Sequence, residues 1–329
     1  MRTRQLGASG LELTTIGLGT WAIGGGDWKF GWGQQDEAEA VAAIHRAVEL
    51  GVNWVDTAPV YGVGRSEEIV GRALRELPPG ARPLVATKLG RINNPDGSIT
   101  PRLEADSIRR ECDESLRRLG VEAIDLYQMH WPEPDADIEA GWEAMEGLRR
   151  AGKVRHIGVC NYSVSQLRRV GRLAPVVSLQ PPYSMLRRET EDELLPYCGQ
   201  HRIGVVAYSP MGKGLLTGKF TPARAASLEP SDHRTRDPNF LEPRLSVHLE
   251  LVDGLQRIAA EAGRDAAQLA IAWVLRRPEV TSAIVGARNP RQIDQTAAAG
   301  DWELSAAEAS AIDGLLTTHA AALATLPAA

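Results

Sequence analysis

The sequence predicts a (β/α)₈ barrel, and three observations lead to this prediction. The chain has 329 residues, enough for a fold of about 250 residues with a large buried core. Short apolar segments rich in β-formers alternate along it with segments of helical period. These segments make eight strand-then-helix units, which fit a closed barrel better than an open doubly wound sheet. We expect one domain over residues 1–329, because no linker or low-complexity segment divides them.

The eight units follow one another without long gaps until the seventh. In chain order the predicted strands and helices are residues 16–19 with 37–50, 54–56 with 67–77, 84–88 with 103–119, 124–130 with 139–151, 154–159 with 165–170, 177–180 with 192–201, 204–208 with two helical patterns after 244, and 282–285 with 291–299. Strands such as residues 84–87 are apolar without alternation, as expected when parallel strands are buried on both faces.

The third helix illustrates how the helices are predicted. Its apolar residues recur at spacings near three and four, which indicates one buried stripe: Leu103, Ile108, Cys112, Leu116 and Leu119. Pro101 suits an early position in this helix, and Gly120 suits a stop after it.

Two stretches interrupt the alternation. Residues 3–6 and 11–14 flank Gly7-Ala8-Ser9-Gly10, which predicts a hairpin ahead of the barrel. Between Tyr208 and Ser282 lie 73 residues, and residues 217–244 within them contain four prolines and read as a loop. A long loop in a compact domain is typical of a functional lid.

Composition excludes several classes of protein. The 37 basic and 42 acidic side chains leave a net charge of −5 without a basic run, so a nucleic-acid partner is not expected. No stretch approaches 18 consecutive apolar residues, and the first 13 residues lack an apolar targeting core, so no membrane association is expected. Three cysteines without a CxxC pair do not form a disulfide framework. We therefore expect a cytoplasmic protein.

Two nucleotide-binding motifs are excluded by their context. Residues 17–22 match the relaxed GxGxxG/A pattern, but the glycine-rich segment behind them cannot open the helix that a Rossmann site needs. Gly218-Lys219 lacks the other residues of a P-loop. No compact metal-ligand spacing occurs, so no metal site is predicted.

Four polar residues fall where a barrel carries its chemistry, at the C-terminal ends of strands and in the loops that follow. They are Asp56, Tyr61, Lys88 and His130. Each has an ordinary structural alternative: a turn cap, a packed loop aromatic, an outward-reaching lysine and a core histidine. Together they favour function, because all four would converge on one barrel mouth.

This set of residues suits carbonyl reduction. A free phenol has a pKa of about 10, too high for an efficient acid at neutral pH. The ammonium of Lys88, held by Asp56, is expected to lower the pKa of Tyr61. Tyr61 would then protonate the alkoxide formed by hydride transfer, while a neutral His130 orients the substrate oxygen or passes a proton.

Several segments in fixed order resemble the aldo-keto reductase superfamily. They are DTAPVYG at residues 56–62, ATK at 86–88, DLYQMHWP at 125–132, GKVRHIGVCN at 152–161, YSPMGKGLLTGK at 208–219 and IVGARNPRQ at 284–292. The similarity runs from about Arg4 to Trp302, and GTWAIGG at 19–25 resembles a bacterial branch that includes general stress proteins.

The resemblance implies an NAD(P)H-dependent aldehyde or ketone reductase with Asp56, Tyr61, Lys88 and His130 as its catalytic tetrad. NADPH is the expected cofactor and NADH the alternative, because Arg288, with Gln292, matches the position that meets a 2′-phosphate. Asn161 and Gln180 match the residues that bind the nicotinamide carboxamide. The cofactor-binding residues implied by the resemblance are Thr20, Trp21, Asn161, Gln180, Tyr208, Ser209, Pro210, Leu216, Gly218, Lys219, Gly286, Arg288 and Gln292.

Three positions depart from the family pattern. Cys160 stands where serine is usual, and Gln295-Thr296 stand where Glu-Asn is common, so the adenosine contacts are expected to differ. Asn161, Gln180 and Arg288 also have structural alternatives, as caps and as a solvated loop charge.

Tryptophans of the first and fourth loops predict an aromatic pocket for an apolar carbonyl compound. Trp21 and Trp131 are assigned to the substrate pocket, whereas Trp28 and Trp32 suit the pocket and rim packing equally. Residues 236–240 are assigned to a cofactor lid.

A cofactor-holding regulatory subunit with little catalysis is the alternative function, and metal-dependent hydrolysis a third. The expected partner is a small-molecule carbonyl substrate, and the expected state a monomer or weak homo-oligomer.

Overall fold

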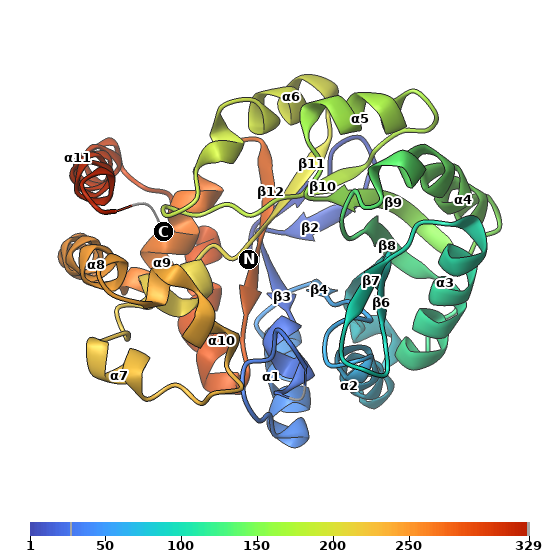
Figure 1. Ribbon diagram of the computed structural model, residues 1–329, viewed down its shortest axis with the longest axis horizontal. Helices are drawn as coiled ribbons and strands as arrows, with labels where there is room; N and C mark the ends of the chain where they lie inside the picture. Colours follow the sequence, from blue (N-terminus) through green and yellow to red (C-terminus); the bar gives the residue numbers. More distant parts are fainter. Residues whose placement is uncertain (27, 328–329) are drawn as a thin grey trace.

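The computed structural model describes residues 1–26 and 28–327. Within these residues, eight parallel strands close into a barrel in the order β10-β11-β12-β3-β4-β5-β8-β9, and helices surround it (Figure 1). Because β12 pairs with β3 over Ala283–Ile16 to Gly286–Gly19, the sheet has no open edge. The predicted (β/α)₈ barrel is confirmed.

The strands and helices largely match the segments expected from periodicity. The barrel strands are β3 (Ile16–Gly19), β4 (Trp54–Asp56), β5 (Leu84–Leu89), β8 (Ile124–Met129), β9 (Val154–Cys160), β10 (Ser178–Gln180), β11 (Gly204–Tyr208) and β12 (Val280–Gly286). The helices between them are α1 (Glu37–Glu49), α2 (Arg65–Glu76), α3 (Ala105–Leu119), α4 (Ile138–Arg150), α5 (Val164–Gly171), α6 (Leu194–His201), α8 (Arg244–Glu261), α9 (Ala266–Leu275) and α10 (Pro290–Ala297).

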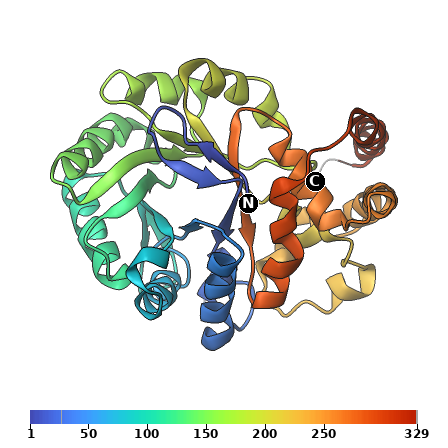
Figure 2. The ribbon, with the colours of Figure 1, turned by 180° about the vertical axis from the view of Figure 1, so that it is seen from behind.

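The predicted N-terminal hairpin covers one end of the barrel. It pairs β1 (Thr3–Gln5) with β2 (Glu12–Thr14). In Figure 2, which shows the molecule from behind, the hairpin lies on the side that faces the viewer. Leu6 and Leu13 are fully buried among barrel-interior side chains, including Trp54. Gly7 lies at φ +55°, and a Cβ there would approach the Arg202 carbonyl to 2.5 Å, so the turn requires glycine. The hairpin therefore closes the end opposite the strand C-termini.

The loop after β5 contains an unexpected hairpin. Strands β6 (Arg91–Asn93) and β7 (Ile99–Pro101) pair antiparallel, and α3 begins only at Ala105. The placement of Pro101 inside the helix is therefore wrong, because Pro101 ends a strand. Gly120 does stop α3, in a left-handed conformation with φ 67°.

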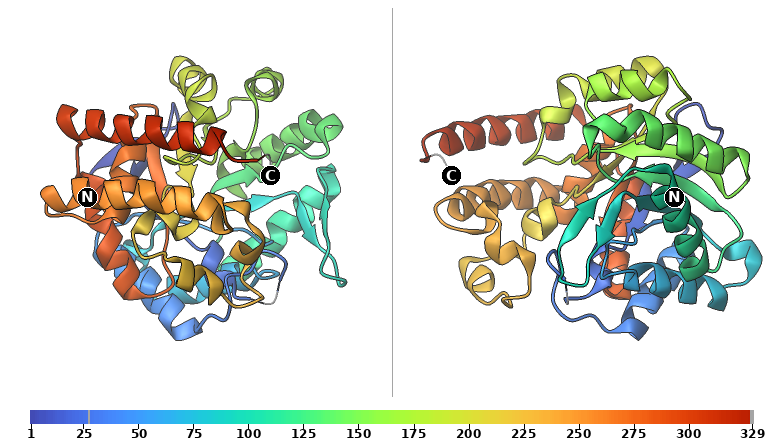
Figure 3. Two further views of the ribbon diagram at one scale, coloured as in Figure 1. Left: turned by 60° about the vertical axis from the view of Figure 1, so that its left-hand side comes forward. Right: turned by 45° about the vertical axis from the view of Figure 1, so that its right-hand side comes forward.

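The seventh unit and the C-terminus also contain more regular structure than expected. Residues 217–244, expected as a loop, include the short helix α7 (Pro222–Ala226) and two 3₁₀ turns. A helix that periodicity did not reveal, α11 (Ala306–Ala324), packs against α8, as Figure 3 shows at left. Its start carries a capping box of Ser305 and Glu308, a sequence signal that could have found it.

Two features are expected to be absent: a helix directly after the glycine motif of residues 17–22, and a helix that could span a membrane. After the GxGxxG/A segment, residues Trp21–Gly24 form a 3₁₀ turn rather than an α-helix, as the exclusion of a Rossmann site requires. Across residues 1–26 and 28–327, no helix combines the length and apolarity that a membrane crossing needs.

Candidate active site

The four predicted catalytic residues lie together at the C-terminal mouth of the barrel. Asp56 is the last residue of β4, Lys88 lies near the end of β5, and His130 directly follows β8. Tyr61 stands in the loop between β4 and α2. Adjacent parallel strands carry these positions because β4 pairs with β5 and β5 with β8. The pairing of these neighbouring strands therefore brings together side chains up to 74 positions apart.

An ion pair inside the barrel anchors the site. Lys88 Nζ donates to Asp56 Oδ2 at 2.6 Å and to the Thr57 carbonyl at 2.9 Å. The two side chains are 0% and 4% exposed. Gln180 Nε2 donates to the other oxygen of Asp56 at 2.8 Å. A buried pair with these further hydrogen bonds holds each charge in one place.

Tyr61 lies between the ion pair and two aromatic neighbours. Lys88 Nζ is 5.1 Å from the centre of the Tyr61 ring. The His130 ring meets it edge-on, with centroids 5.8 Å apart and planes at 79°. Trp21 stacks near its other side at 6.4 Å. The phenol is thus confined beside a fixed cation and an imidazole.

Burial sets the protonation states here. Burial raises the pKa of Tyr61 above its usual value, and the Lys88 ammonium offsets only part of that effect. The expected net lowering of this pKa is therefore wrong for the protein alone, because desolvation of the phenolate is the larger effect. Burial also lowers the pKa of His130 well below its usual value, helped by Lys88 and Arg91.

Lys88 itself stays charged despite its burial. Desolvation acts to lower its pKa, yet Asp56 and then Tyr61 act in the opposite direction and raise it above the usual value. At neutral pH the site therefore presents a protonated phenol, a neutral imidazole and an ammonium.

One cavity of about 790 Å³ joins this mouth to the far end of β12. Of the predicted site residues, those on its wall are Asp56, Tyr61, His130, Trp21, Trp131, Asn161, Gln180, Tyr208, Ser209, Pro210, Lys219, Gly286, Arg288 and Gln292. Its length from Tyr61 to Arg288 suits an elongated ligand rather than a small carbonyl compound alone.

Three predicted cofactor residues do not line this cavity. Thr20 is fully buried, and its hydroxyl donates to the Asp56 carbonyl at 2.9 Å. Leu216 belongs to the hydrophobic core, and Gly218 accepts a hydrogen bond from Gln256 through its carbonyl. The side chains of Thr20 and Leu216 are buried away from the cavity, because a motif fixes the position of a residue along the chain and not the direction of its side chain.

At the middle of the cavity, Asn161 links two strand ends. Its Nδ2 donates to the His130 carbonyl at 3.0 Å, and its Oδ1 accepts from the Tyr208 hydroxyl at 3.0 Å. Asn161 adopts φ 62°, a left-handed conformation that asparagine tolerates. Cys160 beside it is buried, which raises the pKa of its thiol. The hydrogen bond to Asn161 holds the Tyr208 ring at the cavity wall.

At the far end, the departures from the family pattern make contacts of their own. Gln295 Oε1 accepts from Lys219, and Gln295 Nε2 donates to Asp265 Oδ2 at 2.6 Å. The Thr296 hydroxyl donates to the Gln292 carbonyl at 3.0 Å, within α10. Gln295 therefore fixes Lys219 at the cavity wall, whereas Thr296 lines the cavity with its hydroxyl bonded to its own helix.

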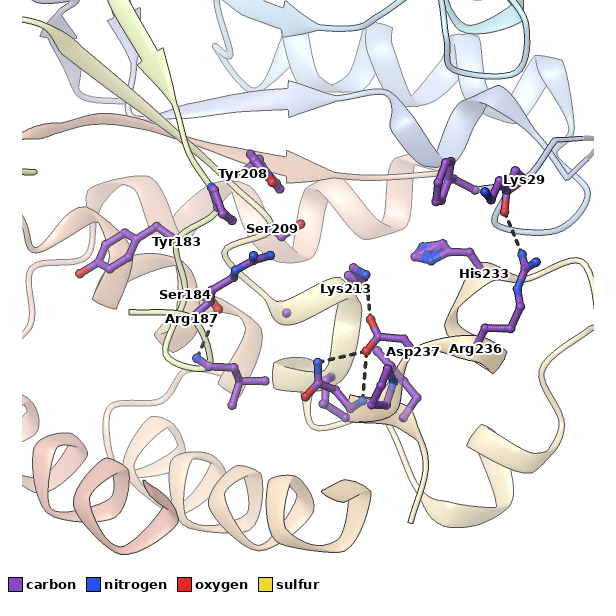
Figure 4. Close-up of a pocket in the computed structure, with 18 residues that line it drawn as sticks. Lys29, Tyr183, Ser184, Arg187, Tyr208, Ser209, Lys213, His233, Arg236 and Asp237 are labelled. Carbon is purple, nitrogen blue, oxygen red and sulfur yellow. Dashed lines mark hydrogen bonds and ion pairs between the residues drawn. The ribbon is translucent and has the colours of Figure 1, made fainter. Parts of the chain in front are cut away.

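The predicted lid segment borders a neighbouring cavity of about 570 Å³ (Figure 4). Asp237 accepts from Lys213 Nζ at 2.7 Å, and Arg236 donates to the Lys29 carbonyl at 2.8 Å. His233 lines both cavities and packs flat on Trp21, with centroids 4.9 Å apart. The segment thus joins the turn that follows β11 to the first loop of the barrel.

The aromatic pocket includes both tryptophans whose role the sequence left undecided between pocket and rim packing, and two residues that the sequence did not indicate. Trp28 and Trp32 both line the large cavity, and Trp28 lies 6.1 Å from the Tyr61 ring. Trp131 is 37% exposed there. Arg91 and Ile99, from the β6–β7 hairpin, also line it. The turn signal Asn94-Pro95-Asp96-Gly97 between them could have revealed this hairpin.

Metal binding has no evident centre in the described chain. No group of three or more His, Cys, Asp or Glu side chains among residues 1–26 and 28–327 could hold a metal ion.

The barrel and its cavity, with a buried lysine–aspartate pair beside a tyrosine and a histidine, define the class of a barrel oxidoreductase. Comparison with known proteins identifies the family. The profile of the Aldo/keto reductase family matches residues 15–317, and the chain belongs to that family.

Curated relatives and solved structures agree with this assignment. Aldo-keto reductase YhdN of Bacillus subtilis is 37% identical over 96% of this chain and 94% of its own length. An NADH-specific methylglyoxal reductase of Escherichia coli is 34% identical over 94% and 97%. The solved glycerol dehydrogenase of Gluconobacter oxydans is 38% identical, covers 96% of this chain and 95% of its own, and superposes with a TM-score of 0.87. The protein is therefore an oxidoreductase that uses a nicotinamide cofactor.

Proposed function

We propose that this protein reduces an aldehyde or ketone to an alcohol with NADPH, with Tyr61 as the proton donor. The observation that carries the proposal is the convergence of Tyr61, His130 and the buried Asp56–Lys88 pair at one end of the large cavity. The bound cofactor supplies the hydride to the carbonyl carbon, and the chain's own residues bind, orient and protonate.

The protonation states support the role of Tyr61. Its raised pKa keeps the proton on the phenol until an alkoxide forms beside it. The Lys88 ammonium lowers the cost of losing that proton, and Asp56 keeps the ammonium charged. Neutral His130 can donate one N–H to the carbonyl oxygen of the substrate, which orients the carbonyl toward Tyr61.

The residues along the cavity fit a dinucleotide. Tyr208 presents a half-buried ring beside Asn161 and Gln180, a surface suited to a nicotinamide ring and its carboxamide. The amide nitrogens of Asn161 and Gln180 are engaged with the His130 carbonyl and Asp56. Toward a carboxamide, Asn161 therefore offers its second amide N–H, and Gln180, whose nitrogen donates to Asp56 and Gln128, offers its side-chain oxygen.

The electrostatic surroundings fit the phosphates. Ser209 and Lys219 line the middle and far parts of the cavity, and Arg288 lines its end. The contacts at that end favour a cofactor with an anionic adenosine group, because Arg288 donates only to neutral acceptors.

The decisive experiment compares the wild type with Tyr61→Phe. We expect NADPH absorbance to decay with an activated aromatic aldehyde in the wild type, and kcat to fall by about 10²–10⁴-fold in the variant, the usual contribution of a general acid. NADPH binding, followed by tryptophan fluorescence, should be retained. Equal rates in the two proteins would refute the assignment of Tyr61.

A cofactor-holding regulatory subunit is the alternative. Tight NADPH binding with no turnover across a broad panel of aldehydes and ketones would favour it. That one domain spans residues 1–329, that the protein is cytoplasmic, and that it is a monomer or weak homo-oligomer stay predictions, the last to be measured by analytical ultracentrifugation.

A further inference from the structure

The guanidinium of Arg288, at the start of the segment between β12 and α10, is held by the first loop of the barrel. Its Nε donates to Gln35 Oε1 at 2.7 Å, and its Nη1 donates to the Trp32 carbonyl at 3.0 Å. Its Nη2 donates to the Gln34 carbonyl. A guanidinium has five N–H donors, so two N–H bonds remain for a ligand.

None of these hydrogen bonds joins Arg288 to a carboxylate, and Asp232 and Glu229 act on its positive charge only through space. All three acceptors are neutral, an amide oxygen and two backbone carbonyls. The side chain is half-buried, and burial lowers its pKa below the usual value. A partly desolvated cation on a cavity wall binds an anion more strongly than a solvated one.

Gln35 fixes the orientation of this cation. Its side chain is buried, at 8% exposure, and its Nε2 donates to the carbonyls of Arg288 at 3.0 Å and of Asp36 at 2.8 Å. The amide cannot be reversed, because its NH₂ would then face the Nε–H of Arg288. Gln35 therefore grips both the backbone and the guanidinium of Arg288, 253 positions away.

The side-chain amide of Gln292 offers a further, neutral hydrogen-bond donor beside Arg288. The backbone N–H of Arg288 donates to Gln292 Oε1 at 2.8 Å, and Gln292 lines the cavity. This contact commits the oxygen of the Gln292 amide to the backbone and leaves its NH₂ group for the cavity side. The remaining donors of Arg288 and Gln292 thus suit one anionic group that accepts several hydrogen bonds, such as a phosphate monoester.

We propose that Gln35 is a positioning residue that orients Arg288 toward the 2′-phosphate of the cofactor, and that it thereby determines the preference for NADPH over NADH. The proposal rests on the proposed function only in taking the large cavity as the cofactor site. It assigns the preference to a contact between two loops rather than to Arg288 alone.

The test measures binding of two cofactor fragments, adenosine 2′,5′-bisphosphate and 5′-AMP, by isothermal titration calorimetry. The ratio of their Kd values isolates the 2′-phosphate and requires no carbonyl reduction. We expect the wild type to bind the bisphosphate at least about tenfold more tightly, as for one charge-assisted interaction. Gln35→Met, which keeps the side-chain volume, should reduce that ratio to within about threefold of unity.

Two further variants make the test specific. Gln35→Glu places a carboxylate against the guanidinium and should abolish the preference. Gln34→Ala is the matched control, because it changes a neighbouring exposed glutamine of the same loop and keeps the backbone carbonyl that Arg288 contacts. It should retain the wild-type ratio. Thermal unfolding and 5′-AMP binding of each variant report whether the site is folded.

Three results would overturn the proposal: a wild type without preference for the bisphosphate, Gln35 variants with the wild-type ratio, or an equal loss of preference in Gln34→Ala. If the fragments behave as expected while NADPH is not oxidised by any carbonyl substrate, the proposed function fails and the role of Gln35 stands.

Discussion

Two lysine–aspartate pairs of almost equal length lie near the two cavities: Asp56 of one pair lines the large cavity, and Lys213 and Asp237 line the neighbouring one. Lys88 and Asp56 are 2.6 Å apart on neighbouring strands, with side chains 0% and 4% exposed. Lys213 and Asp237 are 2.7 Å apart in the segments that follow β11, with side chains 32% and 13% exposed. Distance does not distinguish them, but surroundings do. The buried pair is shielded from the solvent that could replace a lost partner, whereas the pair of Lys213 and Asp237 is partly exposed to it.

The largest effect is expected at the buried pair. Lys88→Met should leave the Asp56 carboxylate unpaired inside the barrel, which costs about 3–5 kcal/mol in the free energy of unfolding. Carbonyl reduction should fall with it, because Tyr61 loses the cation that stabilises its phenolate. Chemical denaturation and NADPH oxidation measure the two effects.

The double variant Asp56→Asn/Lys88→Met separates the effect on stability from the effect on activity. It removes both charges, so it should recover most of the stability lost in Lys88→Met without recovering activity. If activity returned with stability, the role of the pair would be structural alone.

An intermediate effect, through a change of pH, is expected at His233, which precedes the predicted lid segment 236–240. Burial lowers the pKa of His233 to about 4, with Lys213 and Arg234 acting in the same direction and Asp232 and Asp237 against it. Its folded-state pKa lies below the unfolded value of about 6.5. Its contribution to stability is therefore present above pH ~6.5 and is lost as the pH falls toward 4, by about 3 kcal/mol in total.

The variant His233→Gln tests this dependence by thermal unfolding between pH 4 and 8. It should lose less stability on acidification than the wild type. Parallel pH profiles of the two proteins would show that His233 does not contribute to acid sensitivity.

The smallest effect is expected at the pair of Lys213 and Asp237. Asp237→Asn should lower the free energy of unfolding by no more than about 1 kcal/mol, as for a partly exposed ion pair. Cofactor binding should weaken only a few-fold, because the amide oxygen of the substituted residue can still accept from the Asn239 backbone N–H. Urea denaturation and fluorescence titration give both values, and a double-mutant cycle with Lys213→Met isolates the pair. A loss as large as that of Lys88→Met would remove the contrast between the two pairs.

How far the sequence predicted the site depended on the kind of contact. Asp56, Lys88 and His130 were predictable because each ends a strand that periodicity reveals, and parallel strand ends meet at one mouth. The β6–β7 hairpin is not among the predicted elements, although the turn residues 94–97 are typical of one. Pro101 was assigned to the following helix because the apolar stripe of that helix begins close behind it, whereas Pro101 pairs with Arg91 in the hairpin. Thr20 and Leu216 were placed by motif alone, and a motif does not state which way a side chain points.

By itself the sequence determined the order of strands and helices, the family and the residues at the strand ends, because these depend on local periodicity and on motifs in a fixed order. Only the tertiary structure decided the net direction of the Tyr61 pKa, which depends on depth of burial. It alone joined Arg288 to Gln35, since contacts across 253 positions arise from barrel closure rather than from any local pattern.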